Sequence, residues 1–341
     1  MGHEDRRADG WYVAPVDELR RAIKTDFSLR VVAAVTTRLV AEASERHGLR
    51  GVEVVALGRA LTAGCLLTTL TKHATERVRV ELRSSGPLRG LLVDARGDGS
   101  VRGCLQRHLS SDEHAQLAAR APVSSSLAGS LAGSLAGSLA GSLAGVGAGR
   151  VAVAPAVGQR GTVTVTRDLG LDQRYQGSVE VASGEVDVDL EHYLNASEQL
   201  PSVLACEVIL DRYGKVLRAA GLLCQTFPDG DTAELEQLRG VLAAGNLADL
   251  LRHDRSCSEL IGFSLGGEAF DDMGASPLCF RCGCGPERAR QIVSTLGAAD
   301  IEALADEQPQ TEVRCEYCGA VYSLDSAALR ALAAEIRRGR S

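Results

Sequence analysis

Apolar residues recur at helical spacing in two segments near the start of the chain. Between residues 32 and 48 they follow a helical period and end at Gly48, which predicts a helix closed by a glycine C-cap. Residues 56–73 are apolar on nearly every side of such a helix. We therefore expect two helices, the second of them buried in a core.

The pattern then changes to the alternation of apolar and polar positions that is typical of strands. Residues 77–104 alternate in this way and contain turn residues at 86–87 and 97–99, so they predict a meander of antiparallel strands. Later segments predict strands at 161–170 and 174–189, a helix around 190–201 and a closing hairpin at 205–230. Helices packed on a mainly antiparallel sheet give an α+β core domain, expected over residues 16–230.

A low-complexity segment interrupts this domain. The tetrapeptide SLAG repeats five times from Ser126 to Gly145, within an uncharged stretch from Ala121 to Gly149. Its length would suit a membrane helix, but Ser and Gly make up half of it. A soluble helix is also disfavoured, because each Gly costs about 1 kcal/mol relative to Ala. We expect a flexible insertion at 124–149 in a surface loop.

Residues 231–278, called the linker from here on, differ from the domain before them. Leucines recur at helical spacing after Asp231, a candidate N-cap, but Gly240 and Gly245 interrupt the pattern. Residues 264–277 read as a loop. We expect a helical, metastable linker that folds only while it packs against a neighbour.

Composition and charge narrow the choice of partners. The chain has 45% hydrophobic and 24% charged residues, as a globular protein does, and a net charge of −7, which argues against nucleic acid as a partner. Residues 1–15 are charged and lack the apolar run of a secretion signal. We expect them to be a disordered tail on a cytoplasmic protein that does not enter a membrane.

The ten cysteines are unevenly distributed. Half of them lie between residues 279 and 318, and in a reducing compartment such a cluster indicates metal or redox chemistry rather than structural disulfides. The others are scattered, and three of these lie in apolar runs where a cysteine is usually a small buried hydrophobe: Cys65, Cys206 and Cys224.

Cys315 and Cys318 form a C-x-x-C-G motif, in which both sulfurs can face one ion and Gly319 permits the tight turn beneath them. A second cysteine group thirty-odd residues upstream predicts a single zinc site with four thiolates. Histidine ligands are excluded there, because no His follows residue 253.

The spacing leaves the upstream pair open. Cys279 and Cys282 form another C-x-x-C-G, whereas Cys282 and Cys284 form a C-x-C. The module at 279–341 is expected to contain helices at 285–297, 299–307 and 326–339 and a strand at 320–325. So small a core should depend on the metal for folding.

The chain resembles the heat-shock protein 33 family of redox-regulated chaperones. A C-x-C and a C-x-x-C thirty residues apart, with Phe280 before them and Tyr322 after them, look like the redox-switch domain of that family. The resemblance extends through nearly the whole chain, because four further segments resemble family segments in the same order: residues 47–67, 86–103, 174–181 and 197–201.

The resemblance implies that one zinc ion per chain is held by Cys282, Cys284, Cys315 and Cys318, and that the reduced protein is idle. Oxidation is then expected to pair Cys282 with Cys284 and Cys315 with Cys318, to release zinc and to unfold the module and the linker. The activated form, a homodimer, would hold unfolding client proteins without ATP or enzymatic turnover.

The sequence also departs from the family. Gly285 stands where members often have Ser, the SLAG insertion has no family counterpart, and Cys279 and Cys257 are extra thiols that could divert disulfide pairing. Two other functions stay open: a thiol–disulfide oxidoreductase and a purely structural zinc-domain protein. A zinc ribbon for nucleic acid is disfavoured, because residues 279–341 carry eight Arg against nine Asp or Glu.

Overall fold

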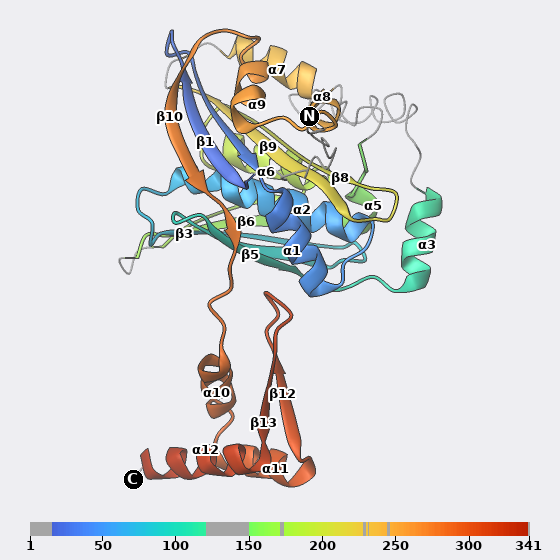
Figure 1. Ribbon diagram of the computed structural model, residues 1–341, viewed down its shortest axis with the longest axis vertical. Helices are drawn as coiled ribbons and strands as arrows, with labels where there is room; N and C mark the ends of the chain where they lie inside the picture. Colours follow the sequence, from blue (N-terminus) through green and yellow to red (C-terminus); the bar gives the residue numbers. More distant parts are fainter. Residues whose placement is uncertain are drawn as a thin grey trace, which may run out of the picture.

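The structure is a computed structural model that describes residues 16–120, 150–170, 174–227, 230, 232–243 and 246–339. Figure 1 shows a large α+β body and a small C-terminal module joined to it by an extended segment. The predicted tail at 1–15, the SLAG insertion at 124–149 and the predicted N-cap Asp231 lie outside the described residues.

Two mainly antiparallel sheets form the large body, as the predicted α+β class requires. The first has the strand order β11-β5-β4-β3-β6-β7 and the second β10-β1-β2-β9-β8. Their strands are β1 Glu18–Lys24, β2 Leu29–Val35, β3 Arg77–Ser84, β4 Gly90–Arg96, β5 Ser100–Leu105, β6 Gly161–Asp168, β7 Arg174–Glu180, β8 Ser202–Leu210, β9 Val216–Thr226, β10 Phe270–Pro277 and β11 Cys279–Phe280. Within the described chain, only β11 and β5 pair in parallel.

The helix α2, Val52–Leu67, lies between the two sheets and contacts strands of both (Figure 1). It matches the predicted buried helix: all but its first residue is buried. Gly58 permits a close approach to neighbouring elements, because a Cβ there would lie 2.7 Å from Val40 Cγ1 and 2.8 Å from Val208 Cγ2. The span Val52–Leu70 is apolar and long enough to cross a membrane, but 89% of it is buried inside the protein.

The predicted helix at 32–48 was wrong in its first part. Residues up to Val35 belong to β2, and the helix α1 runs from Thr37 to His47. Gly48 closes it with φ 63°, as predicted. The run Val31–Val35 is buried on both faces of a central strand, so it is uniformly apolar and its spacing could not distinguish strand from helix.

The predicted strand at 174–189 was likewise too long. β7 ends at Glu180, and the helix α6, Val186–Ala196, follows a tight turn. Asp189 accepts hydrogen bonds from the backbone N–H groups of Ser183 and Gly184 at 2.8 and 3.0 Å. This buried carboxylate therefore fixes the turn before the helix.

The predicted meander and the closing β8–β9 hairpin are confirmed. Other short helices described in the body are α3 Ser111–Arg120, η1 Thr68–Leu70 and α5 Ala154–Val157.

Three linker helices cover the outer face of the second sheet (Figure 1): α7 Ala233–Ala243, α8 Asn246–Leu251 and α9 Cys257–Ser264. Their apolar side chains form one cluster with side chains from β1, β2, β8 and β9. The linker members of this cluster are Leu235, Leu238, Leu242, Leu247, Leu251, Cys257, Leu260, Ile261 and Leu265. The predicted helical linker thus packs against the core as one layer.

The expected loop at 264–277 is largely a strand. β10 pairs antiparallel with β1 from Phe270 to Pro277 and forms the edge of the second sheet. Most of its side chains are exposed. An edge strand without a buried face has no apolar alternation, so the sequence pattern could not reveal it.

The C-terminal module has its own small core. Its elements are α10 Pro286–Ser294, α11 Ala298–Glu307, β12 Gln310–Arg314, β13 Val321–Asp325 and α12 Ser326–Gly339. The three helices and β13 agree with the predicted elements, whereas β12 was not predicted. The buried residues of this core cluster are Val293, Ile301, Ala305, Leu329, Leu332 and Ala333. So few side chains provide little burial energy for a module of this size.

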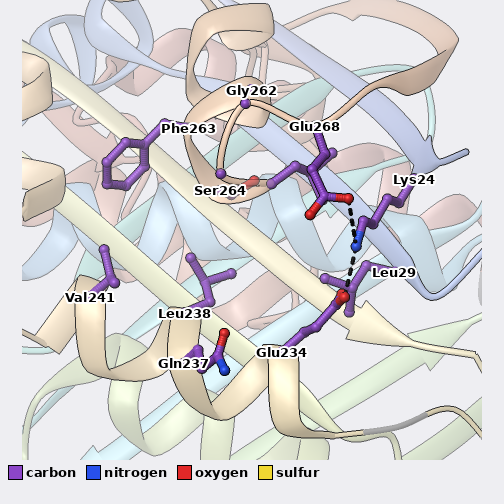
Figure 2. A pocket seen from close by; sticks show the side chains of 13 residues that line it. Lys24, Leu29, Glu234, Gln237, Leu238, Val241, Gly262, Phe263, Ser264 and Glu268 are labelled. Carbon is purple, nitrogen blue, oxygen red and sulfur yellow. Dashed lines mark hydrogen bonds and ion pairs between the residues drawn. The ribbon is translucent and has the colours of Figure 1, made fainter. Parts of the chain in front are cut away.

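Lys24 joins the linker to the core sheet (Figure 2). Its side chain is buried at the end of β1, and its Nζ lies 2.7 Å from Glu234 on α7, 3.0 Å from Glu268 after α9 and 3.1 Å from Asp26. The hydrogen bond to Glu234, with those to the other two carboxylates, raises the pKa of Lys24. One cation therefore holds both ends of the helical layer.

We expect Lys24→Gln to loosen α7 and α9, because three carboxylates would be left around a neutral amide. Hydrogen exchange of the α7 backbone amides should become faster than in the unmodified protein. Lys215→Gln, in the exposed β8–β9 turn, is the matched control and should leave exchange unchanged. Equal exchange in both variants would contradict the role of Lys24.

Candidate metal centre

Four cysteine side chains converge at the end of the module that faces the core. The sulfur atoms of Cys282, Cys284, Cys315 and Cys318 all lie within 4.8 Å of one another. The Sγ atoms of Cys282 and Cys315 are 3.7 Å apart, and those of Cys284 and Cys318 are 3.2 Å apart. Sulfurs around a tetrahedral zinc ion with Zn–S bonds of about 2.3 Å would lie roughly 3.8 Å apart. The donor set and its spacing fit such an ion.

Two turns supply these thiols. Cys282 and Cys284 lie between β11 and α10, and Cys315 and Cys318 lie in the turn between β12 and β13. In that turn the N–H of Gly319 donates to the carbonyl of Cys315 at 2.8 Å, and Gly319 adopts φ 69°, which glycine does without strain. The predicted role of this glycine in the turn is confirmed.

Cys279 lies outside the cluster. It belongs to β11, where it pairs with Ser100 of β5, and its backbone N–H donates to the carbonyl of Gly99 at 3.0 Å. Of the two upstream pairs that the spacing left open, the structure therefore brings together Cys282 and Cys284 with the downstream pair.

The environment of the thiols separates their acidities. Burial disfavours the Cys284 thiolate, but the Tyr322 hydroxyl donates to its sulfur at 3.1 Å, and together with the neighbouring thiols this lowers the pKa of Cys284 to about 7. Burial raises the pKa of Cys315 and Cys318. Cys284 is thus the easiest of these three thiols to deprotonate.

The remaining cysteines are removed from this chemistry by burial. Cys65, Cys206 and Cys224 are fully buried, as predicted, and burial raises the pKa of each thiol. Cys257 is buried in α9, and burial raises its pKa to about 12. Cys104, on β5, is also buried and has its pKa raised to about 12.

Core residues reach the four-cysteine cluster across the domain boundary. The Arg102 guanidinium, on β5, lies 3.5 Å from the Cys282 sulfur and 4.1 Å from the centroid of the Tyr317 ring. Arg79, on β3, donates to the Tyr317 hydroxyl at 3.0 Å, and His47 contacts the Tyr317 carbonyl at 3.1 Å. Tyr317, one of the two residues between the downstream cysteines, is therefore held by three core side chains.

Backbone contacts close the same boundary. A Cβ on Gly319 would lie 2.6 Å from the carbonyl oxygen of Arg46, so only glycine allows this approach without displacement. The Arg46 guanidinium stacks over the Phe280 ring at 5.4 Å. Phe280 and Gly319 could be recognised from the sequence. The same is not true of Arg102, Arg79, His47 and Tyr317, because nothing in their local spacing indicates a partner far away in the chain.

Comparisons with known proteins agree with this architecture. A family model described as Hsp33 protein matches residues 17–325. The curated 33 kDa chaperonin of Synechocystis sp. is 34% identical over 328 residues, which cover 94% of this chain and 97% of that protein. The 33 kDa chaperonin of Geobacter sulfurreducens is 32% identical over 308 residues, with 90% and 91% covered.

A solved structure shares the fold. The crystal structure of the 33 kDa chaperonin from Thermotoga maritima, described as a heat shock protein 33 homolog, matches with a TM-score of 0.75. The match covers 95% of this chain and all of that one at 22% identity. Because the family model spans most of the chain and relatives above 30% identity cover nearly all of it, the chain belongs to the Hsp33 family.

Proposed function

We propose that this protein is a redox-regulated chaperone that holds unfolding proteins after its cysteines are oxidised. The observation that carries the proposal is the position of the four-cysteine cluster. It lies where the module meets the core, directly after a linker that covers an apolar sheet face. The names of its relatives, 33 kDa chaperonin, support the chaperone activity.

In the reduced state Cys282, Cys284, Cys315 and Cys318 would hold one zinc ion. When bound, zinc keeps the four sulfurs as thiolates and joins the two turns that carry them. The small apolar core of the module then has a crosslink between its N-terminal segment and its hairpin, so we expect the module to stay folded only in this state.

Oxidation would act on the thiolates themselves. Two thiolates give two electrons to one molecule of hydrogen peroxide, which takes up two protons and leaves as two waters, while a sulfur–sulfur bond forms. As in the related family, we propose that Cys282 pairs with Cys284 and Cys315 with Cys318. Disulfide sulfurs are poor ligands for zinc, so the two turns would no longer be joined.

Loss of the module would free the linker at its C-terminal end. The chain runs from β10 through Leu278 into β11, and both strands are attached to core strands only at sheet edges. Release of α7, α8 and α9 would expose the apolar outer face of the second sheet, and we propose that this face binds clients. Its residues include Val31, Ala33, Val35, Val203, Leu222 and Cys224.

This function needs no ATP, because binding an unfolded segment to an exposed apolar face is favourable by itself. We propose that the oxidised protein forms a homodimer, as the family resemblance implies, and that it acts in the reducing cytoplasm. A thiol–disulfide oxidoreductase is the weaker candidate. Its cysteine pair normally stands at a helix N-terminus, whereas Cys315 and Cys318 lie in a hairpin turn.

Metal analysis tests the ligand set. We expect about one zinc per chain in the reduced protein and a loss of most of it in Cys282→Ser or Cys315→Ser, because three thiolates bind zinc far more weakly than four. Cys279→Ser is the control and should retain zinc. Plasma emission spectrometry of the purified proteins gives the zinc stoichiometry. If Cys279→Ser lost its zinc and Cys282→Ser retained it, the assignment of the upstream ligand pair would be wrong.

Light scattering tests the chaperone activity. A heat-denatured enzyme is mixed with zinc-loaded reduced protein or with protein oxidised by peroxide during mild warming. We expect suppressed aggregation only after oxidation, and its reversal when a dithiol reductant is added before the client. Absence of suppression in both states would leave a structural zinc module.

Gly240 offers a test of the linker. It lies inside α7, and a Cβ there would meet nothing within 4 Å. Gly240→Ala should therefore stabilise the helix by about 0.5–1 kcal/mol and delay activation. Gly240→Pro should have the opposite effect, because proline interrupts the helix. Oxidant-dependent cleavage of the linker by a protease measures both; identical cleavage of the two variants would refute a linker-controlled switch.

A further inference from the structure

Arg102 is a core residue that makes a polar contact with a predicted metal ligand. Its guanidinium reaches the Cys282 sulfur at 3.5 Å and stacks on Tyr317 at 4.1 Å, while its other nitrogen donates to Asp94 at 2.9 Å. The Arg102 side chain is only 22% exposed. A charged group in this position is shielded from water, so its partners determine how favourable the position is.

Around Arg102, the core surface that faces the module carries more positive than negative charge. The Asp94 carboxylate is buried, and it accepts hydrogen bonds from Arg79 at 2.7 and 3.1 Å as well as from Arg102. Two guanidinium groups thus share one carboxylate. Arg77, which lies 3.7 Å from the same carboxylate, has a second partner in Asp168 at 3.0 Å. Arg79 and Arg102 therefore leave a surplus positive charge facing the module.

The four-cysteine cluster supplies the complementary charge. Four thiolates around one divalent zinc ion carry a formal charge of about −2, which is spread over the sulfurs. A guanidinium beside one of these sulfurs makes a charge-assisted contact, and such contacts are about twice as strong as neutral ones. Two disulfides in the same positions would carry no charge.

We propose that Arg102 binds the negative charge of the four-thiolate centre, so that docking of the module on the core depends on the charge state of its cysteines. This inference rests on the proposed function. Zinc loss and undocking of the module would then be separate events, because Arg102 does not hold the zinc ion but holds the module that contains the ion. After oxidation Arg102 keeps Asp94 and loses its other anionic partner.

The connection from docking to the linker is short. Arg102 lies next to Val101, the residue whose main chain pairs with Phe280 of β11. The backbone N–H of Arg281 also donates to the carbonyl of Val101 at 2.9 Å. Undocking would therefore release β11 first, and β10 and the linker helices would follow as the next segments toward the N-terminus.

The test compares variants in the reduced, zinc-loaded full-length protein. Arg102→Gln removes the charge but keeps a polar side chain, and Arg102→Lys keeps the charge but loses the planar group that stacks on Tyr317. Arg83→Gln is the control: Arg83 also lies in the first sheet, but it is exposed and forms an ion pair with Glu81. Two readouts are taken, zinc per chain and the rate of linker cleavage by a protease.

We expect Arg102→Gln to retain zinc and to be cleaved about tenfold faster than the unmodified protein, a factor that corresponds to about 1.4 kcal/mol. The cleavage rate of Arg102→Lys should lie between those of Arg102→Gln and the unmodified protein, and the rate of Arg83→Gln should equal that of the unmodified protein. Retained zinc with unchanged cleavage would overturn the inference. So would loss of zinc from reduced Arg102→Gln, because Arg102 would then act on the metal site itself.

A variant on the other side of the contact guards against a disrupted core sheet. Tyr317→Leu removes the ring on which Arg102 stacks without changing a core residue, and it should also accelerate cleavage while zinc is retained. Failure of the proposed function would look different. In that case the unmodified protein would bind no zinc, or its linker would be equally protected before and after oxidation.

Discussion

The structure depends on one constraint: the central strands of the second sheet are apolar on both faces, so the sheet must be covered twice. Along β2, Val32 and Ala34 face the cluster around α2, while Val31, Ala33 and Val35 face the linker helices. The inner cover is permanent, because α2 is embedded between two sheets. The outer cover consists of short helices from a separate segment of the chain. Under the proposed function, its removal would uncover the apolar surface of the sheet.

The attachment of the outer cover explains how it could respond to a distant event. Its apolar contacts are supplemented by polar contacts at its edges, such as the carboxylates around Lys24. At its C-terminal end it continues through β10 into the segment that carries Cys282 and Cys284. Short helices gain little stability from their own backbone hydrogen bonds. Their order thus depends on what both ends are attached to.

The four-cysteine cluster lies at the segment to which the C-terminal end of the linker is attached. Its thiols come from two turns of a module whose own core is small, and Arg102 of the core contacts Cys282 and stacks on Tyr317 in one of these turns. A change of charge at the four sulfurs would therefore affect the folding of the module and also its docking on the core. Under the proposed function, this arrangement joins a local chemical step to the exposure of an apolar surface.

Much of this could be read from the sequence. The buried helix α2, the antiparallel meander, the helices of the module and the downstream pair Cys315 and Cys318 were all predictable, because apolar periodicity and ligand spacing are properties of short segments. Spacing left the upstream cysteine pair open, and only the family resemblance implied Cys282 and Cys284. The similarity to a known family could likewise be recognised from motif order alone.

Other features were decided only by tertiary structure. β10 is a strand because β1 offers it an edge, β2 is a strand rather than a helix because two layers bury it, and Cys279 lies outside the cluster because β5 pairs with its backbone. Arg102 meets Cys282 across 180 residues of chain. Such contacts follow from which surfaces pack together, and no local pattern of residues encodes them.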